Sequence, residues 1–148
     1  MEGGDISNLT PPRFLFVYDG LIGTIESAAQ QKKERFYTTL RRWDKAVACR
    51  TINDTALSYI WDIAWRWNMQ IDIATFLPYH EAIHRQLEEE GVPFSNFRHY
   101  VRPEVLAMKL AYMPYVHRVY FSEPKRRFLF GDRGVYVPTM EKFDPTGS

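Results

Sequence analysis

The sequence contains a single cysteine, Cys49, and this scarcity excludes an intrachain disulfide and a metal site built from cysteines. No apolar run approaches the roughly 20 residues that a membrane-spanning helix needs. The first residues also lack the basic and then apolar pattern of a secretory signal. These absences predict a soluble protein that is intracellular, cytoplasmic or associated with a particle, and that has no membrane partner.

An excess of charge of either sign is missing too. The chain carries 19 Lys and Arg residues against 18 Asp and Glu residues, a net charge of +1, which argues against a strongly electrostatic partner such as bulk duplex DNA. Residues 19–24 (Asp-Gly-Leu-Ile-Gly-Thr) are too short for a nucleotide-binding P-loop and lack its lysine. A net charge of +1 is still compatible with a local basic patch. The stretch 125–130 (Lys-Arg-Arg-Phe-Leu-Phe) is a candidate for nucleic-acid contact, although packing of its aromatic rings on the core is the favoured interpretation.

Aromatic side chains, by contrast, are abundant. Phe, Tyr and Trp make up 16% of the residues, and such side chains are buried, stacked or used at an interface. Three of the four tryptophans, Trp61, Trp65 and Trp67, fall within seven residues of one another. They cannot all face the core of a helix that contains them, so we expect most of them to be buried and Trp65 to face a second surface.

Short apolar runs alternate with helical patterns along the chain. Residues 14–18 are apolar or aromatic and are followed by Asp19 and Gly20, which is typical of a strand buried on both faces. Further strands are expected at 69–75, 92–94 and 116–121, with helices at 54–68, at 78–90 and from Pro103. This alternation predicts an α/β, three-layer Rossmann-like fold with a mostly parallel central sheet and helices on both faces. A glycine-bounded loop between 128–130 and 135–137 predicts a C-terminal β-hairpin.

Composition divides the chain into one domain with two extensions. Residues 1–12 are polar, end in two prolines and are predicted to form an N-terminal arm, and residues 138–148 form a polar C-terminal tail. A single α/β domain spans 13–137. Within it, residues 25–53 form an insert after the first strand. The spacing of Ala29, Phe36, Leu40 and Val47 predicts an amphipathic helix over 25–47, with a flap of short strands as the alternative.

Four polar residues fall where strand ends are expected to meet. Asp19 follows the first strand, Thr75 ends the second, Glu123 follows the strand at 116–121, and Lys109 lies on the helix before it. In this order, residues 14–137 resemble the haloacid dehalogenase-like (HAD-like) superfamily of phosphohydrolases, in particular its small cap-less members, including phage-encoded ones. The resemblance implies that Asp19 is a nucleophile, that Thr75 and Lys109 hold phosphoryl oxygens, and that Asp19 and Glu123 bind Mg²⁺.

The catalytic set of that superfamily is incomplete in this chain. The superfamily carries two aspartates two residues apart after its first strand, whereas Asp19 has Val17 two residues before it and Leu21 two residues after it. Neither aliphatic side chain can form an aspartyl-phosphate or transfer a proton. Mg²⁺ takes several oxygen ligands, usually including carboxylates. Only Asp19 and Glu123, with Asp132 as a more distant third, are candidates to supply them.

Two functions are therefore considered. The favoured hypothesis is a catalytically degenerate HAD-like domain, a pseudoenzyme without a cofactor. It would act in binding or assembly, for instance in a phage or virion particle, through its aromatic surface and its termini, with a protein partner or with itself. The alternative is a Mg²⁺-dependent phosphatase that acts on a nucleotide or a nucleic-acid-end phosphate through an aspartyl-phosphate on Asp19. The superfamily reads substrates with cap insertions, and residues 25–53 are the only candidate for one.

Two weaker candidates for chemistry remain. His80 and His84 are four residues apart on one predicted helix face and form a candidate metal pair, but the sequence fixes no third ligand. Cys49 is a candidate nucleophile only by virtue of being a thiol.

Overall fold

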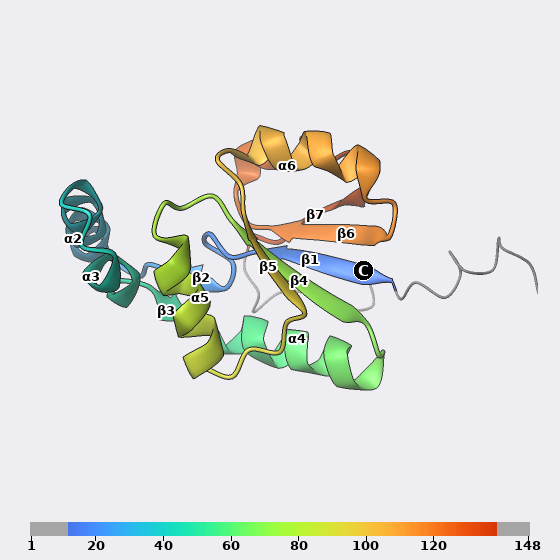
Figure 1. Ribbon diagram of the computed structural model, residues 1–148, viewed down its shortest axis with the longest axis horizontal. Helices are drawn as coiled ribbons and strands as arrows, with labels where there is room; N and C mark the ends of the chain where they lie inside the picture. Colours follow the sequence, from blue (N-terminus) through green and yellow to red (C-terminus); the bar gives the residue numbers. More distant parts are fainter. Residues whose placement is uncertain (1–11, 139–148) are drawn as a thin grey trace, which may run out of the picture.

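The computed structural model describes residues 12–138, which form a five-stranded sheet between two helical layers (Figure 1). The strands, in their order across the sheet, are β5 (Asn96–His99), β4 (Gln70–Thr75), β1 (Arg13–Val17), β6 (Val116–Phe121) and β7 (Gly134–Tyr136). Every neighbouring pair in this sheet is parallel. The predicted α/β, Rossmann-like fold is thus confirmed.

Strand β1 occupies the centre of the sheet because both of its faces are apolar. Phe14 and Phe16 belong to one hydrophobic cluster, and Leu15 and Val17 belong to another. Since alternate residues of a strand point to opposite faces, the two clusters lie on opposite sides of the sheet. A strand of this kind is stable only when helices cover both faces.

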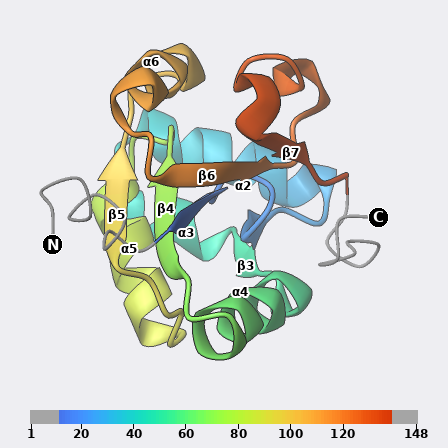
Figure 2. The same cartoon turned by 90° about the vertical axis from the view of Figure 1, so that its right-hand side faces the viewer.

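Helices form the two outer layers. On one face lie α4 (Asp54–Arg66) and α5 (His80–Glu89), and on the other lies α6 (Pro103–Lys109), as Figure 2 shows. Short 3₁₀ segments at Leu110–Tyr112, Pro124–Arg126 and Gly131–Arg133 follow α6. Local chemistry fixes the helix starts: the Asn53 side chain accepts hydrogen bonds from the first amides of α4, and Pro103 opens α6. The strand predicted at 116–121 is confirmed with its bounds.

The insert between β1 and α4 is a helical hairpin on a short stem. Strands β2 (Gly23–Thr24) and β3 (Thr51–Ile52) pair antiparallel as the stem. Helices α2 (Ala28–Thr39) and α3 (Trp43–Ala48) pack on each other and project from the sheet at the left of Figure 1.

The single helix predicted over 25–47 is wrong, as is the flap of strands at 36–39. Arg41 adopts a left-handed conformation, with φ of 56°, and breaks the helix between α2 and α3. Phe36 and Leu40, expected on a buried face, are 59% and 53% exposed. The reason is tertiary: α2 has no buried residue, because it projects beyond the sheet and packs against α3.

The predicted C-terminal hairpin is also wrong, because residues 128–130 form a turn and β7 pairs with β6 in the parallel direction. Phe130 is 5% exposed and its ring packs 5.4 Å from that of Phe121, so this turn is anchored to the core rather than extended as a strand. The third strand begins at Asn96 instead of Val92. Pairing with β4 starts there because the preceding amide, of Ser95, donates to the Ile71 carbonyl.

The tryptophans are distributed differently from the prediction. Trp65 is 76% exposed, as expected, but Trp61 and Trp67 are 39% and 50% exposed instead of buried. Tyr59 and Ile63 occupy the core-facing positions of α4 in their place. The three exposed tryptophans are called the tryptophan surface below.

Two further expectations concern the chain ends and membranes. The predicted arm at 1–12 and tail at 138–148 lie, apart from Pro12 and Pro138, outside the described residues. Within residues 12–138, no helix has both the length and the apolar character needed to cross a membrane.

Candidate functional site

The carboxyl ends of β1, β4 and β6 meet at Asp19. The Thr75 hydroxyl donates a hydrogen bond to Asp19 Oδ1 at 2.6 Å, and the Phe76 amide donates one to Asp19 Oδ2 at 3.2 Å. The Ser122 hydroxyl lies 3.5 Å from the backbone carbonyl of Asp19, to which it donates. Asp19 therefore links the ends of three strands, and both of its carboxylate oxygens already accept a hydrogen bond.

A tight turn after β1 holds Asp19 in this place. The amides of Leu21, Ile22 and Gly23 all donate to the carbonyl of Tyr18, at 3.0–3.3 Å, so the chain makes one helical turn directly after Asp19. Gly20 has φ of +78°, and a Cβ atom there would lie 2.8 Å from Ser122 Oγ. Only glycine adopts this conformation without strain and also allows the end of β6 to approach.

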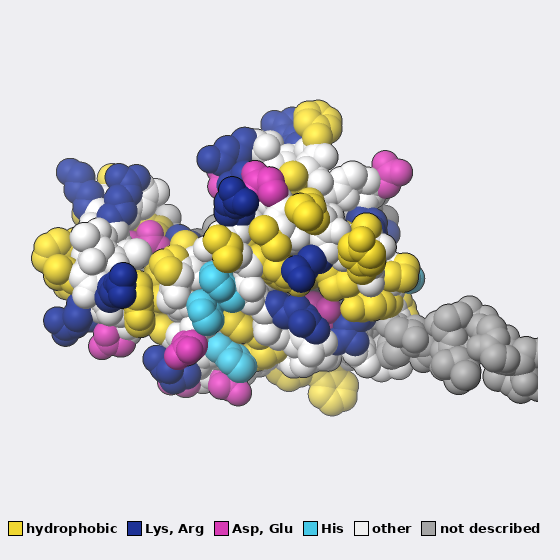
Figure 3. All heavy atoms as spheres, turned by 45° about the horizontal axis from the view of Figure 1, so that its top comes forward, with side chains coloured by type: hydrophobic (Ala, Val, Ile, Leu, Met, Phe, Trp, Pro, Cys, Tyr) yellow, Lys and Arg dark blue, Asp and Glu magenta, His cyan; other side chains and the backbone are white. Residues whose placement is uncertain are grey.

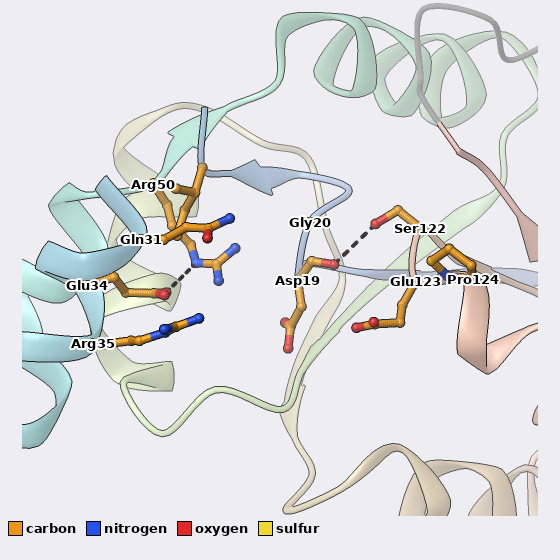
Figure 4. Close-up of a pocket in the computed structure, with 10 residues that line it drawn as sticks. Asp19, Gly20, Gln31, Glu34, Arg35, Arg50, Ser122, Glu123 and Pro124 are labelled. Atoms are coloured by element: carbon orange, nitrogen blue, oxygen red, sulfur yellow. Dashed lines mark hydrogen bonds and ion pairs between the residues drawn. The ribbon is translucent and has the colours of Figure 1, made fainter. Parts of the chain in front are cut away.

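A cavity of about 560 Å³ separates these strand ends from the insert. The strand ends contribute Asp19, Ser122 and Glu123 to its lining, and the insert contributes Gln31, Glu34, Arg35 and Arg50. In Figure 4, the guanidinium groups of Arg35 and Arg50 point toward the cavity from one side, and Asp19 and Glu123 lie on the opposite side. The cavity is therefore bordered by charges of both signs.

Arg50 fixes the insert in its position over the strand ends. Its Nε donates to Glu34 Oε2 and to the Tyr79 hydroxyl, each at 2.8 Å, and its Nη1 donates to the Gly23 carbonyl at 2.8 Å. The Tyr79 hydroxyl also donates to Glu34. Sequence reasoning did not identify Arg50 or Glu34. They lie 16 residues apart, in a helix and in a stem, so no local pattern relates them.

The protonation of Asp19 bears on what this carboxyl can do. Burial raises the pKa of Asp19, while the hydrogen bonds from Thr75 and Phe76 and the charge of Arg50 oppose the rise. The environment of Asp19 thus combines burial, which favours the neutral carboxyl, with donors and a cation that favour the carboxylate.

The structure brings Asp19, Thr75 and Glu123 together but leaves Lys109 elsewhere. Pro103, at the first turn of α6, lines a smaller cavity of about 140 Å³ together with Asp19 and Glu123. Lys109 is the last residue of α6, roughly 9 Å further along the helix axis at 1.5 Å per residue, and it lines a different cavity. A helix between parallel strands starts at their carboxyl ends, so Lys109, at the other end of α6, lies away from that edge.

The residues present do not fit a Mg²⁺ site. Within residues 12–138, no group of three or more His, Cys, Asp or Glu side chains is arranged to hold a metal ion. Val17 and Leu21, at the positions that would complete the carboxylate set, are 3% and 1% exposed and belong to the core. Asp132 lines neither of the cavities at Asp19. Of the candidate ligands, Asp19 and Glu123 remain, and the third carboxylate that lines the cavity, Glu34, is paired with Arg50 at 2.8 Å.

The two histidines of the candidate metal pair stack on different aromatic rings. His80 stacks on His99, with ring centroids 4.2 Å apart, and His84 stacks on Phe97 at 5.1 Å. His84 also lies 3.9 Å from Glu88. Strand β5 thus supplies an aromatic partner to each ring, and no third ligand joins them among the described residues.

The remaining candidates have structural roles. Cys49 is buried, its thiol donates to the Lys45 carbonyl at 3.4 Å, and burial raises the pKa of the thiol, all of which disfavours a nucleophile. In the stretch 125–130, Phe130 packs in the core as favoured, whereas Phe128 is 94% exposed. The guanidinium of Arg127 lies over the Tyr136 ring at 4.8 Å.

Comparison of the chain with protein-family models, with curated proteins and with solved structures finds no match.

Proposed function

We propose that this chain is a catalytically degenerate HAD-like domain that acts by binding and assembly rather than by phosphoryl transfer. One observation carries the proposal: both oxygens of Asp19 are used to join strand ends, through Thr75 and Phe76, and the neighbouring carboxylate positions are the core residues Val17 and Leu21. Asp19 thus connects the ends of β1 and β4 through hydrogen bonds. The strand ends lack the second carboxylate that phosphoryl transfer on this scaffold needs.

The topology supports the HAD-like part of the proposal. The first strand is central, the second lies on one side of it and the strand that precedes Glu123 lies on the other. This arrangement brings Asp19, Thr75 and Glu123 to the same edge, as the resemblance requires. The helical insert stands over that edge, where a substrate-reading cap would be expected.

The first test is for Asp19-dependent chemistry. We expect p-nitrophenyl phosphate in the presence of Mg²⁺ to be hydrolysed no faster by the wild-type protein than by Asp19→Asn, which retains the shape of the side chain. Calorimetry is expected to show no Mg²⁺ binding at sub-millimolar concentration that depends on Asp19. Saturable turnover that is lost in Asp19→Asn would contradict the proposal and establish the phosphohydrolase.

The tryptophan surface supports the assembly part of the proposal. Trp61 and Trp65 stack on each other, with ring centroids 6.1 Å apart and planes 16° apart, and Trp65 is 76% exposed. Aromatic side chains anchor protein interfaces because each buries a large area with little loss of conformational entropy. We propose that this surface binds a second copy of the chain.

Self-association is expected to depend on Trp65. A central tryptophan of an interface contributes about 2 kcal/mol or more, so Trp65→Ala should weaken dimerisation roughly 30-fold in sedimentation equilibrium. Phe128→Ala removes an even more exposed ring outside the tryptophan surface and should leave the dimerisation constant unchanged. A wild-type protein that stays monomeric at about 100 µM, well above the Kd of a specific dimer, would contradict the assembly proposal.

A phosphohydrolase remains the second candidate function because of one observation. Three of the four residues implied by the resemblance do meet: Asp19, Thr75 and Glu123. Lys109 is absent from the cavity at Asp19, but Arg35 and Arg50 supply positive charge to it. The substrate would be a nucleotide or a nucleic-acid end. The assay with Asp19→Asn distinguishes this function from the first.

A further inference from the structure

A cavity larger than the one at Asp19 lies elsewhere on the described part of the chain. A groove of about 770 Å³ lies between α6 and the edge strand β5. Two cationic side chains and three tyrosines line it: Arg98, Lys109, Tyr100, Tyr112 and Tyr115. No carboxylate is among its lining residues. We call it the tyrosine groove.

The groove lies where α6 faces the edge strand β5. In the described part of the chain, α6 is the one α-helix on this face of the sheet (Figure 2), and its Leu106 packs in a cluster with residues of β1, β4 and β6. Tyr100, directly after β5, is 6% exposed and belongs to the apolar cluster under α6. This side of the groove is therefore formed by a side chain that is packed in the core.

The charge of the groove is positive. The charge of Asp72 acts on Tyr100 in the wall of the groove, but this carboxylate is already neutralised: Arg13 donates to it through Nε and Nη2 at 2.9–3.1 Å, and the Asn96 side-chain amide donates at 3.2 Å. Arg98 and Lys109 are exposed and form no ion pair with another described residue. Two uncompensated cations therefore face an open groove in a chain whose net charge is only +1.

The rings of the groove are available for stacking. Tyr112 is 85% exposed and projects from the 3₁₀ turn that ends α6, and Tyr115 is partly exposed beside it. In Figure 3, Lys and Arg side chains lie between the histidines and a gathering of hydrophobic side chains on this side of the molecule. Flat rings beside isolated cations are the combination with which proteins bind unpaired bases and their phosphates.

We propose that the tyrosine groove binds a short segment of single-stranded nucleic acid. Bases stack on Tyr112 and Tyr115, and phosphates lie at Arg98 and Lys109. A duplex is a poor occupant, because its bases are hidden and two cations neutralise too few of its phosphates. The site is separate from Asp19, so the proposal holds whether or not Asp19 is catalytically active.

Fluorescence anisotropy with a labelled ten-nucleotide oligothymidylate at 50 mM salt tests the proposal. Tyr112→Ala should weaken binding about tenfold, because stacking contributes about 1–3 kcal/mol per base. Arg98→Ala and Lys109→Ala should each weaken binding and each reduce the slope of log K against log salt by about 0.7. All three side chains are exposed, so the variants should fold as the wild type does, which circular dichroism verifies.

Matched controls place binding in the groove. Arg85→Ala on α5 and Phe36→Ala on α2 remove an exposed cation and an exposed ring elsewhere and should leave the affinity unchanged. Three outcomes would overturn the proposal: no binding of the oligonucleotide at 50 mM salt, equal affinity in the three groove variants and the wild type, or equally tight binding of a duplex of the same length.

Discussion

Replacing Arg50 by alanine is expected to lower the free energy of unfolding by about 3 kcal/mol, at the lower end of the range for breaking a buried ion pair. The Arg50 and Glu34 side chains are only 11% and 14% exposed, so water cannot replace the lost partner of Glu34. The substitution also removes the hydrogen bonds to Tyr79 and to the Gly23 carbonyl. Urea denaturation followed by circular dichroism measures the loss.

The same substitution should loosen the insert specifically. Arg50 joins the stem to α2 and to the start of α5, so amide hydrogen exchange in α2 and α3 is expected to become faster in Arg50→Ala. Arg66→Ala is the matched control, since Arg66 pairs with Asp62 at 3.2 Å while 74% exposed, and it should cost at most about 0.5 kcal/mol. Equal effects of the two substitutions would show that Arg50 is not the joint of the insert.

Gly23→Ala is expected to cost about 3 kcal/mol, the upper end of the usual penalty for overpacking. A Cβ atom at this position would lie 2.1 Å from Cζ of Tyr18. The Tyr18 ring cannot move away, because it is fully buried and its hydroxyl donates to Gln86 Oε1 at 2.6 Å. The stem of the insert, which begins at Gly23, must therefore shift. Thermal and urea unfolding measure the cost.

Two comparisons separate this collision from general effects of replacing glycine. Gly91→Ala introduces a side chain into open space at φ of +71° and should cost only the roughly 1–2 kcal/mol of a left-handed residue. In a Tyr18→Leu background, which removes the atoms at 2.1 Å, Gly23→Ala should cost much less than in the wild type. Strictly additive costs of the two substitutions would rule out the collision.

The sheet could be predicted from the sequence because its signals are local. The apolar run from Phe14 to Tyr18 permits only a strand covered on both faces, and the run at 116–121 defines β6 with its bounds. The helices after Asn53 and at Pro103 carry capping signals that act within a few residues. The prediction for the insert failed for the opposite reason. Phe36 and Leu40 show helical spacing, but spacing does not reveal that α2 packs mainly against α3 and leaves these two side chains exposed.

The site was predictable only in part. Asp19, Thr75 and Glu123 could be placed together because parallel strands deliver their carboxyl ends to one edge. Lys109 was grouped with them through the family resemblance alone, whereas the parallel topology places the start of α6 at that edge and Lys109 at the far end. Arg50 and Glu34 carried no signal, because their pairing joins a stem and a helix whose relative position is set by the fold.

By itself, the sequence determined the parallel sheet, with a first strand that is apolar on both faces, the position of Asp19 at the end of that strand, and the aliphatic residues Val17 and Leu21 two positions on either side of it. These follow from residue type and short-range periodicity. Only the tertiary structure decided that Asp19 serves as a joint between strands, that Arg50 holds the insert, and that Lys109 belongs to the tyrosine groove. Each of these depends on contacts between residues far apart in the chain, which form only when the layers have packed.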